Sequence, residues 1–223
     1  MKILGILGSP RSRGNTAILL EGVMEGARRA GAETRVISVA SLDTNFCAGC
    51  SHCFRYGQCH YRDDVEKVKE KMLDADGIVL GSPVYIGTVS AQMKTIMDRC
   101  AYFIHCFLLA GKYGAAVATA GAGQAEEVAE FQNRFLRMCG AYTVGAVWAK
   151  GIGTGKLQDE PEAVARAINL GAELVAAIRE RREYPEQAAE HAPLRESMKQ
   201  LVLESREEYP AQYAHWSEQG WLE

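Results

Sequence analysis

Short apolar runs alternate regularly with segments of helical periodicity along most of this chain, and this alternation constrains the fold more than any other feature. The runs have the length and apolar content of strands that are buried on both faces. They fall at residues 3–7, 34–39, 78–80, 113–119 and 142–148. Helical periodicity is found at residues 15–31, from residue 63 onward, through 93–100, and at 128–138 and 161–181. Five strands alternating with five helices predict a parallel sheet covered by helices on both faces.

The strand count favours one topology of this class. A six-stranded dinucleotide-binding sheet needs one more strand, so we expect the flavodoxin-like strand order 2-1-3-4-5 in a doubly wound α/β domain. At 223 residues the chain suits a single large core, which we assign to residues 1–182.

Residues 183–223 differ in composition from the rest, because they are acidic, rich in Tyr and Trp, and interrupted by three prolines. The spacing of Leu194, Met198, Leu201 and Val202 predicts one more helix in this C-terminal extension. We expect the aromatic end to pack at an interface with a neighbouring subunit. Packing on the chain's own core is the alternative.

Composition excludes several classes of partner. With a net charge of −3, the chain lacks the basic excess of a nucleic-acid-binding protein, so we expect no nucleic-acid partner. No apolar run reaches the roughly 18–20 residues that span a bilayer, and the N-terminal run is too short for a signal peptide. We therefore expect a cytoplasmic protein without membrane contact, whose seven cysteines lie in a reducing compartment.

Three loops rich in glycine and hydroxyl residues follow strands one, three and four. In the order 2-1-3-4-5 the carboxyl ends of these strands meet where the strand order reverses, and open α/β sheets bind ligands there. The loops read Gly8-Ser-Pro-Arg-Ser-Arg-Gly-Asn-Thr16, Gly81-Ser-Pro-Val-Tyr-Ile-Gly-Thr88 and Thr119-Ala-Gly-Ala-Gly-Gln124. We therefore expect the ligand site at this end of the sheet.

The first loop has the composition of a phosphate site. Ser9 and Thr16 offer hydroxyls, Arg11 offers charge, and the loop opens a helix whose free N–H groups bind anions. The alternative is an ordinary helix start with solvent-facing arginines. The glycine-rich stretch at 151–156 lacks the spacing of an ATP-binding P-loop, and the chain has no Gly-x-Gly-x-x-Gly motif.

The second loop suits a flat ring. Residues 82–85 would present backbone groups and one aromatic side chain, Tyr85, beside an apolar wall. The alternative is a plain turn at the end of a strand with a half-buried tyrosine.

Taken together, these motifs resemble the NAD(P)H-dependent FMN reductases of the flavodoxin-like fold. The motifs are the first two loops and Lys94-x-x-x-Asp98-Arg99, and the resemblance covers about residues 1–150. It implies FMN as the cofactor, with its phosphate held by Ser9, Arg11, Asn15 and Thr16. It also implies that the isoalloxazine is flanked by Pro83, Val84, Tyr85, Ile86, Gly87, Ala120 and Gly121.

Four of the seven cysteines, Cys47, Cys50, Cys53 and Cys59, follow the spacing C-x2-C-x2-C-x5-C. Close-spaced thiolates of this kind can surround a single [4Fe-4S] cluster, and Gly49 and Gly57 let the backbone turn inward. Zinc, two disulfides or an empty set of free thiols are the alternatives. We expect hydrogen-bonding or solvated roles for the nearby His52 and His60, and core packing for Cys100, Cys106 and Cys139.

A compact cysteine loop in an FMN protein resembles the iron-sulfur flavoproteins. The resemblance implies a [4Fe-4S] cluster on the four cysteines, which passes electrons between a ferredoxin-type donor and FMN, in a homodimer or homotetramer. Because the loop follows an edge strand, we expect electron transfer to be completed across a subunit interface.

The sequence thus predicts an FMN-dependent oxidoreductase with a [4Fe-4S] cluster, taking electrons from a ferredoxin-type donor or NAD(P)H and passing them to a small-molecule acceptor. No catalytic residue is assigned. An NAD(P)H-dependent FMN or quinone reductase without a cluster is one alternative. A non-enzymatic sensor of redox state or zinc, built on the same cysteines, is another.

Overall fold

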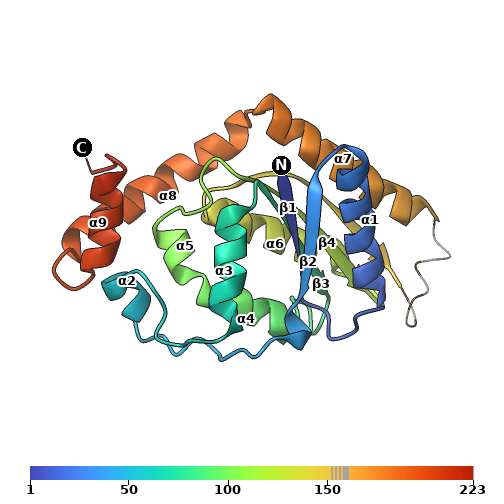
Figure 1. The fold of residues 1–223 in the computed structure, drawn as a ribbon, viewed down its shortest axis with the longest axis horizontal. Helices are drawn as coiled ribbons and strands as arrows, with labels where there is room; N and C mark the ends of the chain where they lie inside the picture. Colours follow the sequence, from blue (N-terminus) through green and yellow to red (C-terminus); the bar gives the residue numbers. More distant parts are fainter. Residues whose placement is uncertain (152, 154, 156, 158–160, 223) are drawn as a thin grey trace.

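The computed structural model describes residues 1–151, 153, 155, 157 and 161–222, so part of the 151–156 stretch lies outside the described residues. Five parallel strands form one sheet in the order β2-β1-β3-β4-β5, which confirms the expected topology (Figure 1). The strands are β1 (Lys2–Leu7), β2 (Glu33–Ser38), β3 (Gly77–Pro83), β4 (Tyr113–Ala120) and β5 (Tyr142–Lys150). Ile3, in β1, pairs with Thr34 on one side and Gly77 on the other.

Helices cover both faces of the sheet, as buried strands require. One face carries α1 (Asn15–Arg29) and α7 (Pro161–Glu180). The other carries α3 (Asp64–Asp74), α4 (Ala91–Arg99), α5 (Ala101–His105) and α6 (Ala125–Met138). The expected helices are therefore present, with Asp63 as the N-cap of α3 through a bond from the backbone N–H of Val65.

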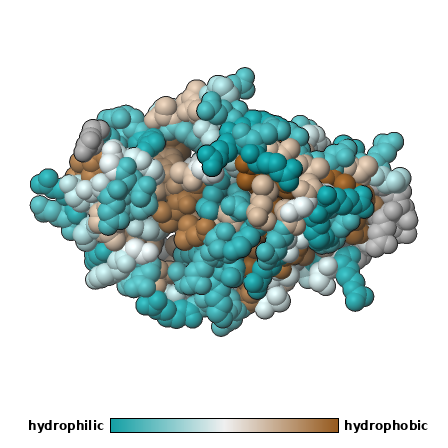
Figure 2. Space-filling model, turned by 45° about the horizontal axis from the view of Figure 1, so that its top comes forward, coloured by the Kyte–Doolittle hydropathy of each residue, from teal (hydrophilic) through white to brown (hydrophobic). Residues whose placement is uncertain are grey.

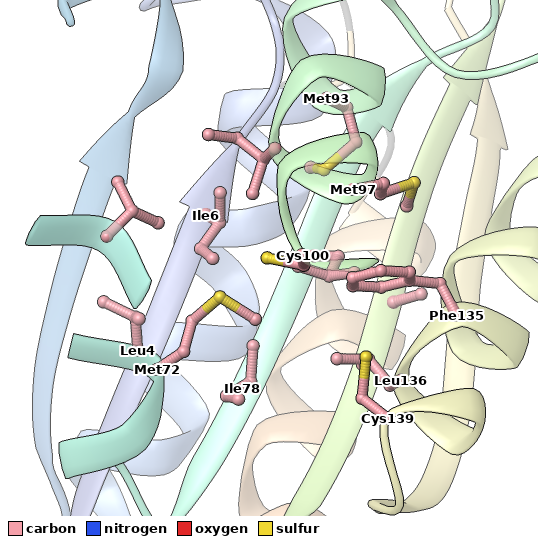
Figure 3. Packing of buried hydrophobic residues seen from close by; sticks show 14 of the residues in the cluster. Leu4, Ile6, Met72, Ile78, Met93, Met97, Cys100, Phe135, Leu136 and Cys139 are labelled. Atoms are coloured by element: carbon pink, nitrogen blue, oxygen red, sulfur yellow. The ribbon is translucent and has the colours of Figure 1, made fainter. Parts of the chain in front are cut away.

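The second face has a core of aliphatic and sulfur-containing side chains that interdigitate between the sheet and its helices (Figure 3). Cys100 and Cys139 lie within this core, as expected, and Cys106 is buried in a third cluster beside it. Burial raises the pKa of Cys100 and Cys106 to about 12. These thiols are packing residues, because a thiol with a pKa so high is protonated at neutral pH.

On the first face, α1 and α7 approach closely because glycines stand at their contact. A Cβ on Gly171 would lie 1.9 Å from the carbonyl oxygen of Val23, and one on Gly26 would lie 1.9 Å from that of Ile168. No side chain larger than hydrogen fits at either position without moving a helix.

The C-terminal extension forms two helices, α8 (Pro185–Glu204) and α9 (Pro210–Glu218). The expected helix around Leu194 is thus longer than the sequence pattern suggested, since α8 runs through Pro193, and α9 is an additional element. The aromatic end packs on the chain's own core: Trp216 is fully buried against Cys106 and Phe107, and its Nε1 donates to the carbonyl of His105 at 2.8 Å. Contact with a neighbouring subunit stays a prediction.

The surface toward the extension is mixed. Most of the face shown in Figure 2 is hydrophilic, while hydrophobic side chains gather in a hollow on the side of the C-terminal helices. Among the described helices, none combines the length and hydropathy needed to cross a membrane.

Candidate functional site

The carboxyl ends of β1, β3 and β4 surround a cavity of about 390 Å³, which is in the size range of small-molecule and cofactor sites. All three glycine-rich loops contribute to it, together with residues that follow β5. The lining residues are Ser9, Arg11, Gly14, Asn15, Thr16, Pro83, Val84, Tyr85, Thr119, Ala120, Gly121, Gly151 and Gly153. The structure thus brings together nine of the eleven residues expected around one ligand.

One end of the cavity is polar and carries an open helix start. The N-cap of α1 is Gly14, which has no side chain to occupy the first free N–H groups of the helix. Ser9 is buried beside it, with a hydroxyl that accepts from the backbone N–H of Arg11 at 3.1 Å. Free N–H groups, a guanidinium and hydroxyls at a helix N-terminus suit an anion such as a phosphate.

Asn15 lines this end, but its side chain is already engaged by the chain itself. Its Nδ2 donates to the carbonyls of Gly151, at 3.2 Å, and Gly153, at 2.9 Å, while its Oδ1 accepts from the N–H of Leu157. Asn15 therefore fixes the segment after β5 as one wall of the cavity. A second tie across the floor joins the hydroxyls of Thr16 and Thr119, 2.6 Å apart.

The opposite end of the cavity is largely apolar and open. Pro83, Val84 and Tyr85 form one side, and the N–H of Val84 donates to the carbonyl of Thr119 at 2.8 Å, which links the second and third loops. The other side is open, because nothing lies within 4 Å of where a Cβ on Gly121 would stand. A flat apolar ring can enter between these two sides.

Two of the expected residues, Ile86 and Gly87, do not line the cavity. They form the tip of a turn in which Tyr85 and Thr88 pair, and both have positive φ, 50° and 76°. Ile86 is fully exposed, which is unusual for a β-branched residue in a left-handed conformation. Their contact with a ring stays a prediction.

Sequence reasoning missed Gly151 and Gly153, which we considered only as part of an absent P-loop. The strand order could have predicted them, since these residues follow β5 at the same end of the sheet as the three loops.

The four clustered cysteines lie on a long segment between the 3-10 helix η1 (Val39–Ser41) and α3, here called the cysteine loop (residues 42–62). The loop contains one short helix, α2 (His52–Tyr56). All four thiols are free, and all four cysteines line one cavity together with Asp98 and Arg99. Gly49 and Gly57 have φ values of 63° and 73°, as expected for turns that only glycine adopts without strain.

The neck of the cysteine loop is closed by a buried ion pair. Arg99, at the end of α4, donates to both carboxylate oxygens of Asp63, at 2.7 and 3.0 Å, and to the carbonyl of Asn45 at 2.9 Å. Burial would raise the pKa of Asp63, but hydrogen bonds from Arg99 and Asn45 outweigh it and hold that pKa far below its usual range. One arginine thus joins the start and the end of the loop.

The tip of the loop is held by the C-terminal extension. The ring of Phe54, in α2, lies 4.3 Å from that of His105 and 5.5 Å from that of Tyr209, which precedes α9. Arg55 donates to the carbonyl of Glu208 at 3.2 Å. In Figure 1, α2 and α9 lie side by side at the same end of the molecule.

Comparison with known proteins agrees with the fold. A sequence model described as NADPH-dependent FMN reductase matches residues 1–155. The chain belongs to the NADPH-dependent FMN reductase family.

Several relatives in sequence are named iron-sulfur flavoproteins. One from Archaeoglobus fulgidus is 34% identical over 223 residues, covering 100% of both chains. Another, from Methanocaldococcus jannaschii, is 44% identical over 139 residues, covering 61% of this chain and 72% of the relative.

Solved structures share the fold. RosB with the bound intermediate 8-demethyl-8-formylriboflavin-5'-phosphate has a TM-score of 0.65 at 17% identity, covering 88% of this chain and 87% of RosB. A flavodoxin from the domain Archaea has a TM-score of 0.54 at 16% identity, covering 80% of this chain and 99% of the flavodoxin.

As a member of this reductase family, the protein is an FMN-dependent oxidoreductase. The strand-end cavity fits FMN, because one end has anion-binding groups and the other has an apolar slot.

The cysteine loop of this FMN reductase family member fits an iron–sulfur cluster in donor type, since four cysteines that form no disulfide line one cavity. The four sulfurs are not gathered: among the described residues, no three Cys, His, Asp or Glu side chains stand in a metal-binding group. The neighbouring histidines have the expected hydrogen-bonding geometry, His52 with the carbonyl of Gln58 at 2.9 Å and His60 with the thiol of Cys50 at 3.2 Å.

Proposed function

We propose that this FMN-dependent oxidoreductase carries a [4Fe-4S] cluster on Cys47, Cys50, Cys53 and Cys59. The observation that carries the proposal is that these four closely spaced free thiols line a single cavity. The names of the relatives from Archaeoglobus fulgidus and Methanocaldococcus jannaschii support the same assignment. Iron rather than zinc is favoured, because zinc sites usually separate two C-x2-C pairs by a longer stretch.

The FMN phosphate binds at the start of α1 in this proposal. Ser9, Arg11 and the N–H groups of the first turn contact it, while Asn15 and Thr16 hold the surrounding segments in place. Pro83, Val84 and Tyr85 bind one side of the ring, with Ala120 and Gly121 on the other. Ile86 and Gly87 border the open rim.

When bound, the cluster supplies transfer of single electrons and FMN supplies transfer of one or two. The chain's own residues orient both groups. Among the described residues that line the strand-end cavity, only Arg11 and Tyr85 have titratable side chains, and the Arg11 guanidinium keeps its proton, so it serves to bind an anion. We propose a ferredoxin-type protein or NAD(P)H as the electron donor and a small molecule as the acceptor. A relative from Geobacillus thermodenitrificans, named NAD(P)H-dependent FAD/FMN reductase, supports NAD(P)H as a donor.

The two cavities share no lining residue, so we propose that the protein works as a homodimer or homotetramer in which electrons cross between subunits. Large apolar side chains are exposed beside both cavities. Phe46 and Tyr56, on the cysteine loop, are 76% and 60% exposed, and Ile86 projects from the turn beside the strand-end cavity. Burying such side chains against a second copy would be favourable.

Anaerobic purification followed by iron, acid-labile sulfide and flavin analysis tests this function. About four iron atoms and four sulfides per chain together with one FMN support the proposal. FMN without iron would leave an NAD(P)H-dependent FMN or quinone reductase. Zinc or a reversible disulfide at the cysteines, with no turnover by any electron donor, would leave a sensor.

A further inference from the structure

Arg99 is the one arginine or lysine that lines the cysteine cavity among the described residues, and one of its hydrogen-bond donors has no partner there. Its side chain is 1% exposed, so each of its polar groups must find a partner within the protein. A guanidinium has five N–H donors in a fixed plane.

Four of these five donors are accounted for. Nη1 donates to the carbonyl of Asn45 and to Asp63, and Nη2 donates to Asp63 and, at 3.3 Å, to Glu66. The fifth donor, Nε–H, is buried and has no partner within the described part of the chain. A buried donor left unpaired is costly, so its persistence points to a ligand.

The charges around Arg99 are balanced, so the Nε–H donor is not needed to neutralise a nearby carboxylate. Asp63 and Glu66 balance Arg99 and Lys69, whose Nζ lies 2.8 Å from Glu66. The ring of Tyr61 lies 5.0 Å from the guanidinium carbon and covers one of its faces. What Arg99 can still offer is therefore one hydrogen bond, from Nε–H, directed in the plane of the guanidinium.

We propose that Arg99 donates its Nε–H to a sulfur of the group bound by the four cysteines. This inference rests on the proposed function, since it takes that group to be the iron–sulfur cluster. A hydrogen bond to a cluster sulfur stabilises the reduced, more negative state more than the oxidised one, and so raises the reduction potential. Arg99 is then a positioning residue through Asp63 and Asn45, and a tuning residue through Nε.

Pulsed electron–nuclear resonance on the reduced protein tests the bond in the unmodified chain. The protein is prepared anaerobically with arginine labelled by 15N at Nε. We expect a hyperfine coupling between the cluster and one labelled nitrogen, and a coupled proton that exchanges in D2O. A cluster signal without any arginine nitrogen coupling would overturn the inference.

A redox titration gives the second test. Arg99→Lys removes the Nε–H but keeps the charge, so we expect its cluster midpoint potential to become more negative while that of FMN stays unchanged. Arg62→Lys is the matched control, because Arg62 is an exposed arginine of the same loop whose Nη1 bonds to Gln58. Equal cluster potentials in Arg99→Lys and the unmodified protein would overturn the inference, whereas protein that holds no iron at all would overturn the proposed function itself.

Discussion

The ring of Phe54, at the tip of the cysteine loop, lies 5.5 Å from the ring of Tyr209, at the start of the C-terminal aromatic segment. The match to the reductase family covers residues 1–155, so Tyr209 lies outside the matched part of the chain. The contact nevertheless places the extension against the proposed cluster site. The extension therefore acts as a support for the cysteine loop.

Replacing Tyr209 with alanine should loosen that loop. An aromatic pair contributes roughly 0.5–1.5 kcal/mol beyond the area it buries, so we expect amide exchange in α2 to speed up by about tenfold. Hydrogen exchange followed by mass spectrometry measures this, with the β4 amides as internal reference. Tyr209→Phe keeps the ring and loses only the long hydrogen bond from the Tyr209 hydroxyl to Ser51 Oγ, at 3.4 Å, so its exchange should stay much closer to that of the unmodified protein than the exchange of Tyr209→Ala does. Equal exchange in Tyr209→Ala and the unmodified protein would show that the extension gives no support.

Replacing Asn15 with alanine should weaken FMN binding, although the proposed contact of Asn15 with FMN is indirect. The change removes three hydrogen bonds to the segment after β5, and a loss of about 1.4 kcal/mol corresponds to a tenfold higher Kd. Fluorescence titration of the apoprotein with FMN measures the Kd. Asn133→Ala is the control, because Asn133 bonds to Gly145 of the same strand outside the cavity, and an unchanged Kd in Asn15→Ala would contradict the role of this wall.

Gly171→Ala should destabilise the fold even though it improves helix propensity. Alanine is better than glycine in a helix by about 1 kcal/mol, but its Cβ would meet the backbone of Val23, and such overpacking costs roughly 1–3 kcal/mol. Urea unfolding measures the difference. Gly123→Ala, where nothing lies within 4 Å, should stay within about 0.5 kcal/mol, and a Gly171→Ala protein as stable as the unmodified one would refute the close approach of α1 and α7.

The Asp63–Arg99 pair should make the fold sensitive to acid. Because the pKa of Asp63 is lowered in the folded protein, its stabilisation is present above the ordinary value of 3.8 and is lost as the pH falls below it. Asp63→Asn leaves Arg99 without its main charge partner, which should cost about 3 kcal/mol at pH 7. Unfolding free energies measured from pH 7 to pH 3 should fall less steeply in Asp63→Asn, and parallel curves for the two proteins would contradict this account.

Local sequence pattern was enough to predict the sheet and its covering helices. Runs such as residues 3–7 are apolar without interruption. A run of this kind is typical of an inner strand of a parallel sheet that is covered by helices on both faces. The strand order followed from the strand count, and the cavity followed from the order, because the glycine-rich loops had to meet at one end of the sheet.

Contacts between distant segments could not be predicted in this way. Nothing near Asn15 in the sequence indicates that its amide binds carbonyls of Gly151 and Gly153. The helix α8 was underestimated because Pro193 reads as a helix end, whereas here it lies inside a helix that starts at Pro185. The pairing of Arg99 with Asp63 likewise depends on tertiary packing, since the two residues are distant in sequence and each is common on helix surfaces.

The measurement that tests the central claim most directly is paired iron and FMN analysis of Cys53→Ser, purified without oxygen beside the unmodified protein and Cys139→Ala. Cys53 lines the cysteine cavity, while Cys139 is buried in the core and should not affect iron. We predict that Cys53→Ser loses its iron and sulfide and retains FMN in full, and that Cys139→Ala retains both groups. Loss of FMN together with iron in Cys53→Ser, or an unmodified protein that contains no iron, would contradict the claim that one chain holds FMN and an iron–sulfur cluster at two separate sites.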